Sequence, residues 1–325
     1  MLLAGDVGGT KALVGLFLDG PGRPTLVDAR AFATCDYPGL EEVIEAFLGG
    51  RPSPVPRLAA ASFGVAGPIV SQVARLTNVP WVVDASVVAS RFGIPNVTLL
   101  NDLQAMAYSV AVLEPGELAV VQAGDPVPGG NAALIAAGTG LGEALLHHVG
   151  GRFIPSPTEG GHADFAPRTA DERALLEHLA SRFGRADYER VISGPGLTNI
   201  HIFTHPDGCG ACGVEAGQTA APSLVTATAL ERRCPACVRA LEIFVSVYGA
   251  EAGNLALRSV ATAGVFVGGG IAPKILPALQ DGRFIDAFCA KAPMEAFMSR
   301  VPVSVILNDR AGLLGAAVHA SLSAA

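Results

Sequence analysis

The sequence is poor in charged and aromatic side chains, which make up 16% and 6% of its 325 residues. Its 22 Lys and Arg are outnumbered by 29 Asp and Glu, which gives a net charge of −7. Proteins that bind the nucleic-acid backbone need clustered basic residues, so we expect no nucleic-acid partner. Hydrophobic residues account for 50% of the chain. They never form a run of about 18, so we expect no membrane-spanning helix.

Two kinds of short signal are absent as well. No Gly-Lys-Ser or Gly-Lys-Thr triplet occurs, which excludes a Walker-A phosphate loop. The first ten residues contain an acid, Asp6, and no basic side chain, so we expect no signal peptide and a cytoplasmic protein. In that compartment the six cysteines are expected to be thiols or metal ligands rather than structural disulfides.

Four of the cysteines form two C-x-x-C pairs, Cys209 with Cys212 and Cys234 with Cys237. The gap between the pairs is slightly longer than the roughly 15–20 residues usual for a structural zinc site. One zinc ion held by all four thiols is one interpretation. Reduced thiols that pack locally are the other.

The length fits two domains of roughly 100–200 residues each. Apolar patterns predict strands over residues 1–4, 13–18, 58–65, 97–100, 118–122, 132–137, 144–149, 264–267 and 303–307. They predict helices over 41–48, from 102 onward, after a capping box at 169–172, over 236–260 and over 312–321. A strand, a glycine turn and a second strand occur near residue 5 and again near residue 138. We therefore expect two halves that face each other across a cleft.

Three glycine-rich turns, at residues 5–10, 137–142 and 268–270, are candidates for binding a nucleotide. In the first, glycines let backbone N–H groups approach phosphate oxygens, Thr10 adds a hydroxyl, and Asp6 can hold Mg²⁺ through water. The second follows an apolar strand, and a base or ribose would explain the three adjacent glycines of the third. A plain turn is the alternative for each. The candidate residues are Gly5, Asp6, Val7, Gly8, Gly9, Thr10, Gly138, Thr139, Gly140, Gly269 and Gly270.

The pair Asn101-Asp102 stands where a predicted strand gives way to a helix. The carboxyl ends of strands open toward ligands in α/β folds. Attack by an alcohol on a phosphoryl group needs a carboxylate to accept the hydroxyl proton, so Asp102 is the candidate general base. A helix N-cap is the alternative role for this aspartate.

Other polar residues suit a sugar, because carboxylates and a neutral imidazole can pair with adjacent hydroxyls. Glu159 and His162 flank two glycines, and no third metal ligand is obvious beside them. Asn78 is a polar residue in apolar surroundings. Glu189, taken alone, is expected to be a solvated surface acid.

The order of these motifs resembles that of bacterial glucokinases, within the superfamily of sugar kinases, heat-shock ATPases and actin. The resemblance covers nearly the whole chain. It is carried by GDVGGT at 5–10, SFGVAGPI at 62–69, LTN at 76–78, NDLQAMA at 101–107, AAGTGLG at 136–142, PSPTEGGHADFAP at 155–167, ERVISGPGL at 189–197, GGGIAP at 268–273 and NDRAGLLGAAVHA at 308–320.

The resemblance implies a glycolytic enzyme that phosphorylates glucose at its 6-hydroxyl with Mg²⁺-ATP, using Asp102 as base. The implied sugar contacts are Asn78, Asn101, Asp102, Glu159, His162 and Glu189. The implied fold is α/β, a two-domain actin-like ATPase (ribonuclease H-like) fold with the active-site cleft between the domains. The first domain would comprise residues 1–112 and 311–325, and the second residues 113–310.

The chain departs from the family pattern at Lys11, where this glucokinase group usually has Asn. The related ROK sugar kinases share this lysine, but their compact C-x-C-G-x-x-G-C-x-E zinc motif is absent here. A kinase for fructose, mannose or an N-acetylated amino sugar stays open as an alternative, as does a non-catalytic sugar sensor. The high apolar fraction favours a homodimer.

Overall fold

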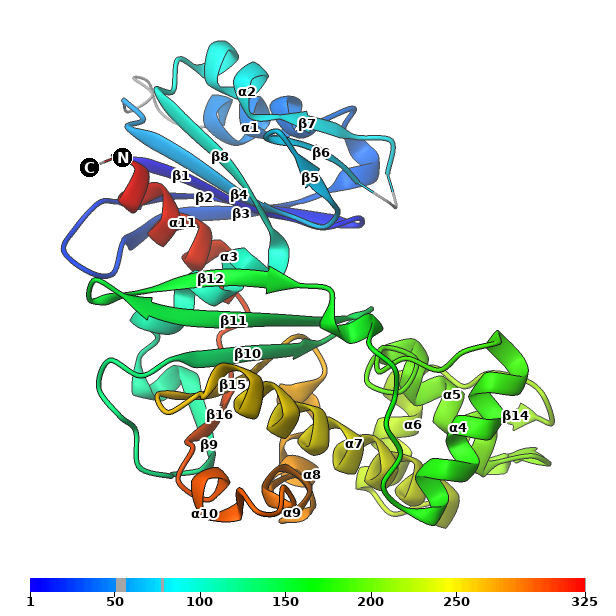
Figure 1. Ribbon diagram of the computed structural model, residues 1–325. Helices are drawn as coiled ribbons and strands as arrows, with labels where there is room; N and C mark the ends of the chain where they lie inside the picture. The colour runs from blue at the N-terminus through cyan, green and yellow to red at the C-terminus, as the bar shows by residue number, and fades with distance from the viewer. Residues whose placement is uncertain (51–56, 77–78, 325) are drawn as a thin grey trace. The chain divides into compact units, whose positions relative to one another are not determined.

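The computed structural model describes residues 1–50, 57–76 and 79–324, which form two units (Figure 1). Unit 1 comprises Met1–Pro115 and Asn308–Ala325, and unit 2 comprises Gly116–Leu307. The predicted boundaries fall at 112 and 310, and the candidate sugar residue Asn78 lies outside the described residues. Within the described part of the chain, no helix has both the length and the apolar character needed to cross a membrane.

Unit 1 is built on a five-stranded sheet with the order β3-β2-β1-β4-β8. The first three strands are antiparallel, whereas β4 runs parallel to β1 and β8 runs parallel to β4. The bounds are Leu2–Val7 for β1, Lys11–Leu18 for β2, Thr25–Ala33 for β3, Ala60–Val65 for β4 and Asn96–Asn101 for β8. A smaller antiparallel sheet contains β5 (Ile69–Val70), β6 (Val73–Arg75) and β7 (Val82–Asp84).

Apolar residues cover both faces of this sheet, because successive side chains of a strand point to opposite faces. Leu3 and Val7 of β1 belong to the core with helices α1 (Leu40–Gly49) and α2 (Ala85–Phe92). Leu2 and Ala4 of β1 belong instead to the core with α3 (Asp102–Ser109) and α11 (Ala311–Ala324). The C-terminal helix α11 is therefore an integral layer of unit 1.

Unit 2 repeats the same arrangement in a six-stranded sheet with the order β12-β11-β10-β15-β16-β9. Strands β12, β11 and β10 are antiparallel, and β10, β15 and β16 are parallel. The bounds are Leu118–Gln122 for β9, Ala132–Ala137 for β10, Leu141–Val149 for β11, Arg152–Thr158 for β12, Gly264–Gly268 for β15 and Val303–Ile306 for β16.

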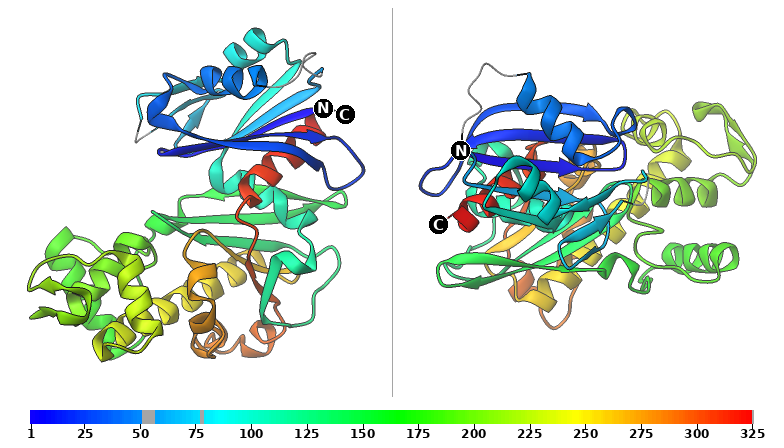
Figure 2. Two further views of the ribbon diagram at one scale, coloured as in Figure 1. Left: turned by 180° about the vertical axis from the view of Figure 1, so that it is seen from behind. Right: turned by 90° about the horizontal axis from the view of Figure 1, so that it is seen from above.

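Helices α4, α5 and α6 of unit 2 form a lobe around the N-terminal part of its longest helix, α7 (Figures 1 and 2). The bounds are Ala170–Phe183 for α4, Gly194–Thr204 for α5, Pro222–Leu230 for α6 and Pro235–Ser259 for α7. Short helices follow β15, namely α8 (Leu276–Leu279), α9 (Arg283–Cys289) and α10 (Glu295–Met298). Further along α7, the hydroxyl of Tyr248 accepts the N–H of Ala137 at 3.2 Å and so ties the helix to β10.

Most predicted strands and helices are confirmed, and the differences have local causes. Strand β1 continues to Val7 rather than ending at Ala4, so Asp6 lies in the strand and not in the turn. Strands β3 and β12 were not expected, because β3 is largely exposed and β12 contains two prolines, which edge strands tolerate. Helix α5 was not expected either. It starts at Gly-Pro-Gly, where Ser193 supplies the N-cap and proline fits the first turn.

Candidate active site

The first glycine turn joins β1 and β2 beside a carboxylate. Strand pairing ends with Val7 opposite Ala12, and the N–H of Gly8 donates to the carbonyl of Lys11 at 2.9 Å. Asp6 lies one residue before the end of β1, where its carboxylate faces α11. A Cβ at Gly312 of α11 would lie 2.6 Å from Oδ2 of Asp6, so glycine leaves room for this carboxylate.

Asp6 has an unusual affinity for a proton. Burial, and then the charge of nearby Asp102, raise its pKa to about 6, although Lys11 acts in the opposite direction. Two neighbouring carboxylates disfavour each other's charged form, and a cation would relieve that repulsion. Oxygen ligands of this kind suit Mg²⁺, so the donor set fits the expected metal.

Asn101 and Asp102 have different roles at the start of α3. Asn101 is the N-cap, and its Oδ1 accepts the N–H groups of Leu103 at 3.0 Å and Gln104 at 3.4 Å. Asp102 is the first residue of the helix and is exposed. The alternative role of Asp102 as N-cap is therefore wrong. The carboxyl ends of β1, β4 and β8 share one edge of the sheet, which explains why Asp6 and Asp102 lie close together.

The second glycine turn joins β10 and β11 in unit 2 and holds Glu189. Oε2 of Glu189 accepts the N–H of Leu141 at 2.9 Å, and a Cβ at Gly140 would lie 2.5 Å from the same oxygen. The carbonyl of Gly138 accepts the N–H of Gly194 at 2.8 Å. Glu189 is half-buried against the turn, so its interpretation as a solvated surface acid is wrong.

The loop that contains Glu159 and His162 is attached to the same place. The N–H of Glu189 donates to the carbonyl of Gly161 at 2.8 Å. Glu159 and His162 are both exposed, and Nδ1 of His162 lies 3.5 Å from a carboxylate oxygen of Asp187. The structure therefore gathers three predicted sugar residues of unit 2 next to its glycine turn.

A cavity of about 730 Å³ opens beside this turn. Gly138 and Thr139 line it, together with Gly270 and Lys274 from the third glycine segment and residues of α5 and α6. Gly269 has a φ of +84° and closely approaches the backbone of Ala137, so the second and third glycine segments pack directly together. Largely apolar walls with backbone groups at one end are typical of a pocket for a small organic ligand.

A sequence model of the family described as Glucokinase matches residues 3–323. The chain belongs to the glucokinase family. A curated relative named glucokinase from Nostoc punctiforme is 38% identical over 340 residues, which cover 99% of each chain. A second, from Stenotrophomonas maltophilia, is 38% identical over 326 residues, which cover 98% of this chain and 95% of that one.

Solved structures share the fold of this glucokinase-family chain. The crystal structure of glucokinase from an Antarctic psychrotroph superposes with a TM-score of 0.88 at 28% identity and covers 98% of each chain. A ROK family glucokinase from Streptomyces griseus, in complex with glucose and AMPPNP, has a TM-score of 0.63 at 22% identity over 99% of each chain. The expected two-domain α/β fold of the actin-like ATPase type is confirmed.

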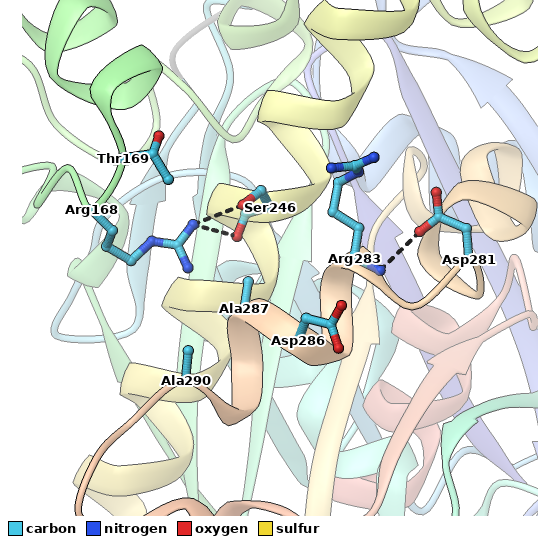
Figure 3. A pocket seen from close by; sticks show the side chains of 8 residues that line it. All are labelled: Arg168, Thr169, Ser246, Asp281, Arg283, Asp286, Ala287 and Ala290. Atoms are coloured by element: carbon cyan, nitrogen blue, oxygen red, sulfur yellow. Dashed lines mark hydrogen bonds between the residues drawn. The ribbon is translucent and has the colours of Figure 1, made fainter.

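A second cavity, of about 550 Å³, involves none of the predicted site residues (Figure 3). The guanidinium of Arg168 donates to Ser246, and that of Arg283 donates to Glu242. Both arginines in this cavity are thus already paired with neighbouring side chains. We assign it no part in the activity of the family.

Glu143 of β11 is a buried acid beside the candidate sugar residues that the sequence did not single out. It is 1% exposed, and neither carboxyl oxygen has a hydrogen-bond partner among the described residues. Burial, and then the charge of Glu251, raise its pKa to about 8, although Arg258 lowers it. A Cβ at Gly160 would collide with its carboxyl group, so Glu143 lies directly under the sugar loop. A lone acid within the apolar first half of β11 was the available signal.

The two C-x-x-C pairs meet inside unit 2. Their thiols are free, and Cys209, Cys212 and Cys237 are buried. The sulfurs of Cys209 and Cys212 each lie 3.7 Å from the sulfur of Cys237. Two histidines, His201 and His205, complete the cluster. Zinc binding stays a prediction for this cluster.

Proposed function

We propose that this chain transfers the γ-phosphoryl group of Mg²⁺-ATP to the 6-hydroxyl of D-glucose. The observation that carries the proposal is the position of Asp102, exposed at the edge of the sheet beside Asp6 while Asn101 caps α3. Full-length relatives named glucokinase support the same activity.

Asp102 acts as general base in this proposal. As the glucose oxygen attacks, a bond from O6 to the γ-phosphorus forms and the bond from that phosphorus to the ADP oxygen breaks. The proton of the 6-hydroxyl passes to the carboxylate of Asp102, which prevents a positive charge from building up on the attacking oxygen. The products are glucose 6-phosphate and ADP.

The proposed sugar contacts are side chains that keep a hydrogen-bonding atom available for a ligand. In unit 2, one oxygen of Glu189 accepts the N–H of Leu141, so its other oxygen, Oε1, is the one that would accept a sugar hydroxyl. The exposed side chains of Glu159 and His162 would pair with neighbouring hydroxyls. In unit 1, Asn101 uses Oδ1 as the helix cap, so its amide nitrogen would be the donor to the sugar.

The glycine turns are the proposed nucleotide contacts. We propose that the turn from Gly8 to Thr10 and the turn from Gly138 to Gly140 donate backbone N–H groups to the phosphates. The cavity beside the second turn would take the adenosine group. Asp6 would hold Mg²⁺ through water, and the bound ion would neutralise charge on the phosphoryl oxygens.

A panel of hexoses tests the assignment. ADP formation is coupled to a spectrophotometric signal, with Mg²⁺-ATP and with glucose, fructose, mannose or N-acetylglucosamine as acceptor. We expect kcat/KM for glucose to exceed that for the other sugars by tenfold or more. A higher kcat/KM for another hexose would replace glucose as the assigned substrate and leave the assignment as a kinase unchanged. Glucose binding without ADP formation would favour a sensor and overturn the proposal. A cytoplasmic location and a homodimer stay predictions.

A further inference from the structure

The cysteine and histidine cluster of unit 2 draws its ligand atoms from three segments of the helical lobe. His205 directly follows α5, Cys209 ends the short strand β13 (Gly208–Cys209), and Cys234 and Cys237 lie at the N-terminus of α7. Two groups have all four ligand atoms within 4.8 Å of one another, namely His201, Cys209, Cys212, Cys237 and His205, Cys209, Cys234, Cys237. Neither group contains all four cysteines.

The spacing of the ligand atoms matches a tetrahedral metal site. With bonds of about 2.3 Å to sulfur and about 2.0 Å to nitrogen, zinc separates two sulfurs by about 3.7 Å and a sulfur from a nitrogen by about 3.5 Å. The sulfurs of Cys209 and Cys237 are 3.7 Å apart. Nε2 of His205 lies 3.3 Å from the sulfur of Cys234 and 3.6 Å from that of Cys237.

The ring of His205 is oriented as a metal ligand would be. Its Nδ1 lies 2.9 Å from the carbonyl oxygen of His201. The hydroxyl of Thr204 also lies 2.9 Å from Nδ1, and it donates its own hydrogen to the same carbonyl at 3.1 Å. Both oxygens can therefore accept from Nδ1, which leaves the lone pair of Nε2 for the thiols. Zinc-binding histidines commonly donate their second ring nitrogen to a backbone carbonyl in this way.

The ring of His201 lacks the hydrogen bond that orients the ring of His205. Neither of its ring nitrogens has a hydrogen-bond partner among the described residues, although the side chain is 1% exposed. Its ring stacks on that of His205, with centroids 4.1 Å apart and planes 21° apart. We propose that one zinc ion binds to Cys209, Cys234, Cys237 and Nε2 of His205, while His201 packs against the ligand ring and Cys212 lies outside the coordination shell.

The role of the ion is structural, because three thiolates and one imidazole leave no open position for a substrate. Binding displaces the three thiol protons to solvent and closes the site around the metal. It links the end of α5 and the β13 segment to the start of α7. The metal would therefore stabilise the lobe that carries α5 and α6.

Metal content tests the site independently of kinase activity. The full chain, made without a polyhistidine tag and purified without chelator, should contain about one zinc per chain by elemental analysis. A mercurial thiol reagent should release that zinc stoichiometrically, and cobalt substitution should give the thiolate charge-transfer bands of a tetrahedral site. Zinc-free protein with six titratable thiols would overturn the proposal.

Single variants identify the ligands. We expect His205→Gln and Cys234→Ser to lose most of the zinc, and His201→Gln and Cys212→Ser to keep it. Cys35→Ser, at an exposed thiol of unit 1, is the matched control. Loss of zinc in His201→Gln or Cys212→Ser, with retention in His205→Gln, would overturn the ligand set. If a ligand variant fails to fold, the mercurial release and the cobalt spectrum of the unmodified chain still decide whether the site exists.

Discussion

The two glycine turns of this chain occupy equivalent places in similar sheets, yet they carry different chemistry. Each joins the first two strands of an antiparallel set, and each lies beside a parallel strand, β4 in unit 1 and β15 in unit 2. In unit 1 the strand before the turn ends in Asp6-Val7, and the carboxylate faces Gly312. In unit 2 the equivalent strand ends in two alanines.

In unit 2 the carboxylate beside the turn, Glu189, comes from a segment that is distant in the sequence. It accepts a hydrogen bond from the N–H of Leu141, and the absence of a Cβ at Gly140 leaves room for it. A carboxylate in the strand itself has a fixed place beside the first turn. In the proposed function the carboxylate from another segment, Glu189, contacts the sugar, while the second turn carries no acid of its own. The same strand–turn–strand unit would then place the catalytic carboxylates in unit 1 and help to orient the ligand in unit 2.

Asp102→Asn should have the largest effect, a loss of kcat. An unchanged kcat would remove the proposed difference between the two units. We expect kcat to fall by about 100-fold or more, because the amide cannot accept the hydroxyl proton. Asp19→Asn, an exposed residue just after β2, is the control and should leave kcat unchanged, since an amide oxygen can keep its hydrogen bonds. Steady-state kinetics with saturating glucose and ATP measures both. Near-normal turnover in Asp102→Asn would contradict the proposed role of Asp102 as general base.

Gly140→Ala should have a smaller effect that separates the two ligands. The new Cβ would displace the carboxylate of Glu189, so we expect KM for glucose to rise by roughly tenfold, the cost of one disturbed hydrogen bond. Gly138→Ala is the matched variant, because its Cβ meets no atom of the described residues within 4 Å. It should raise KM for ATP rather than for glucose. Equal effects of both variants on both constants would show that the turn does not divide the two roles.

Glu143→Gln should change stability rather than catalysis and gives the smallest effect. The pKa of Glu143 is about 8 in the folded chain against 4.5 in the reference state. The folded state thus holds the proton more tightly, and its stability falls as pH rises between those values. Glutamine removes that dependence.

The variant should therefore gain about 1 kcal/mol or more relative to wild type between pH 5 and pH 8, an order-of-magnitude figure. Urea unfolding at both pH values measures the change, with Glu177→Gln on the exposed face of α4 as control. A difference between variant and wild type that does not vary with pH would contradict the raised pKa of Glu143.

The sequence predicted the strands better than the contacts. β9 and β10 agree at both ends, because compact apolar runs are bounded there by turn residues. The choice between Asn101 and Asp102 as N-cap depends on backbone angles, which the residue types do not distinguish. The bond from Leu141 to Glu189 spans 48 residues, and the approach of His205 to Cys234 spans 29. Such partners follow from tertiary packing and leave no local pattern.

The contact between Gly312 and Asp6 has a consequence for how the chain is made. During translation β1 leaves the ribosome before unit 2, and α11 leaves after it. Until then the side of the sheet that contains Leu2 and Ala4 is covered by α3 but lacks α11, the second helix that buries it. The half of the molecule that begins first is therefore completed last, and nascent chains stopped before residue 311 should expose an apolar surface that holdase chaperones bind.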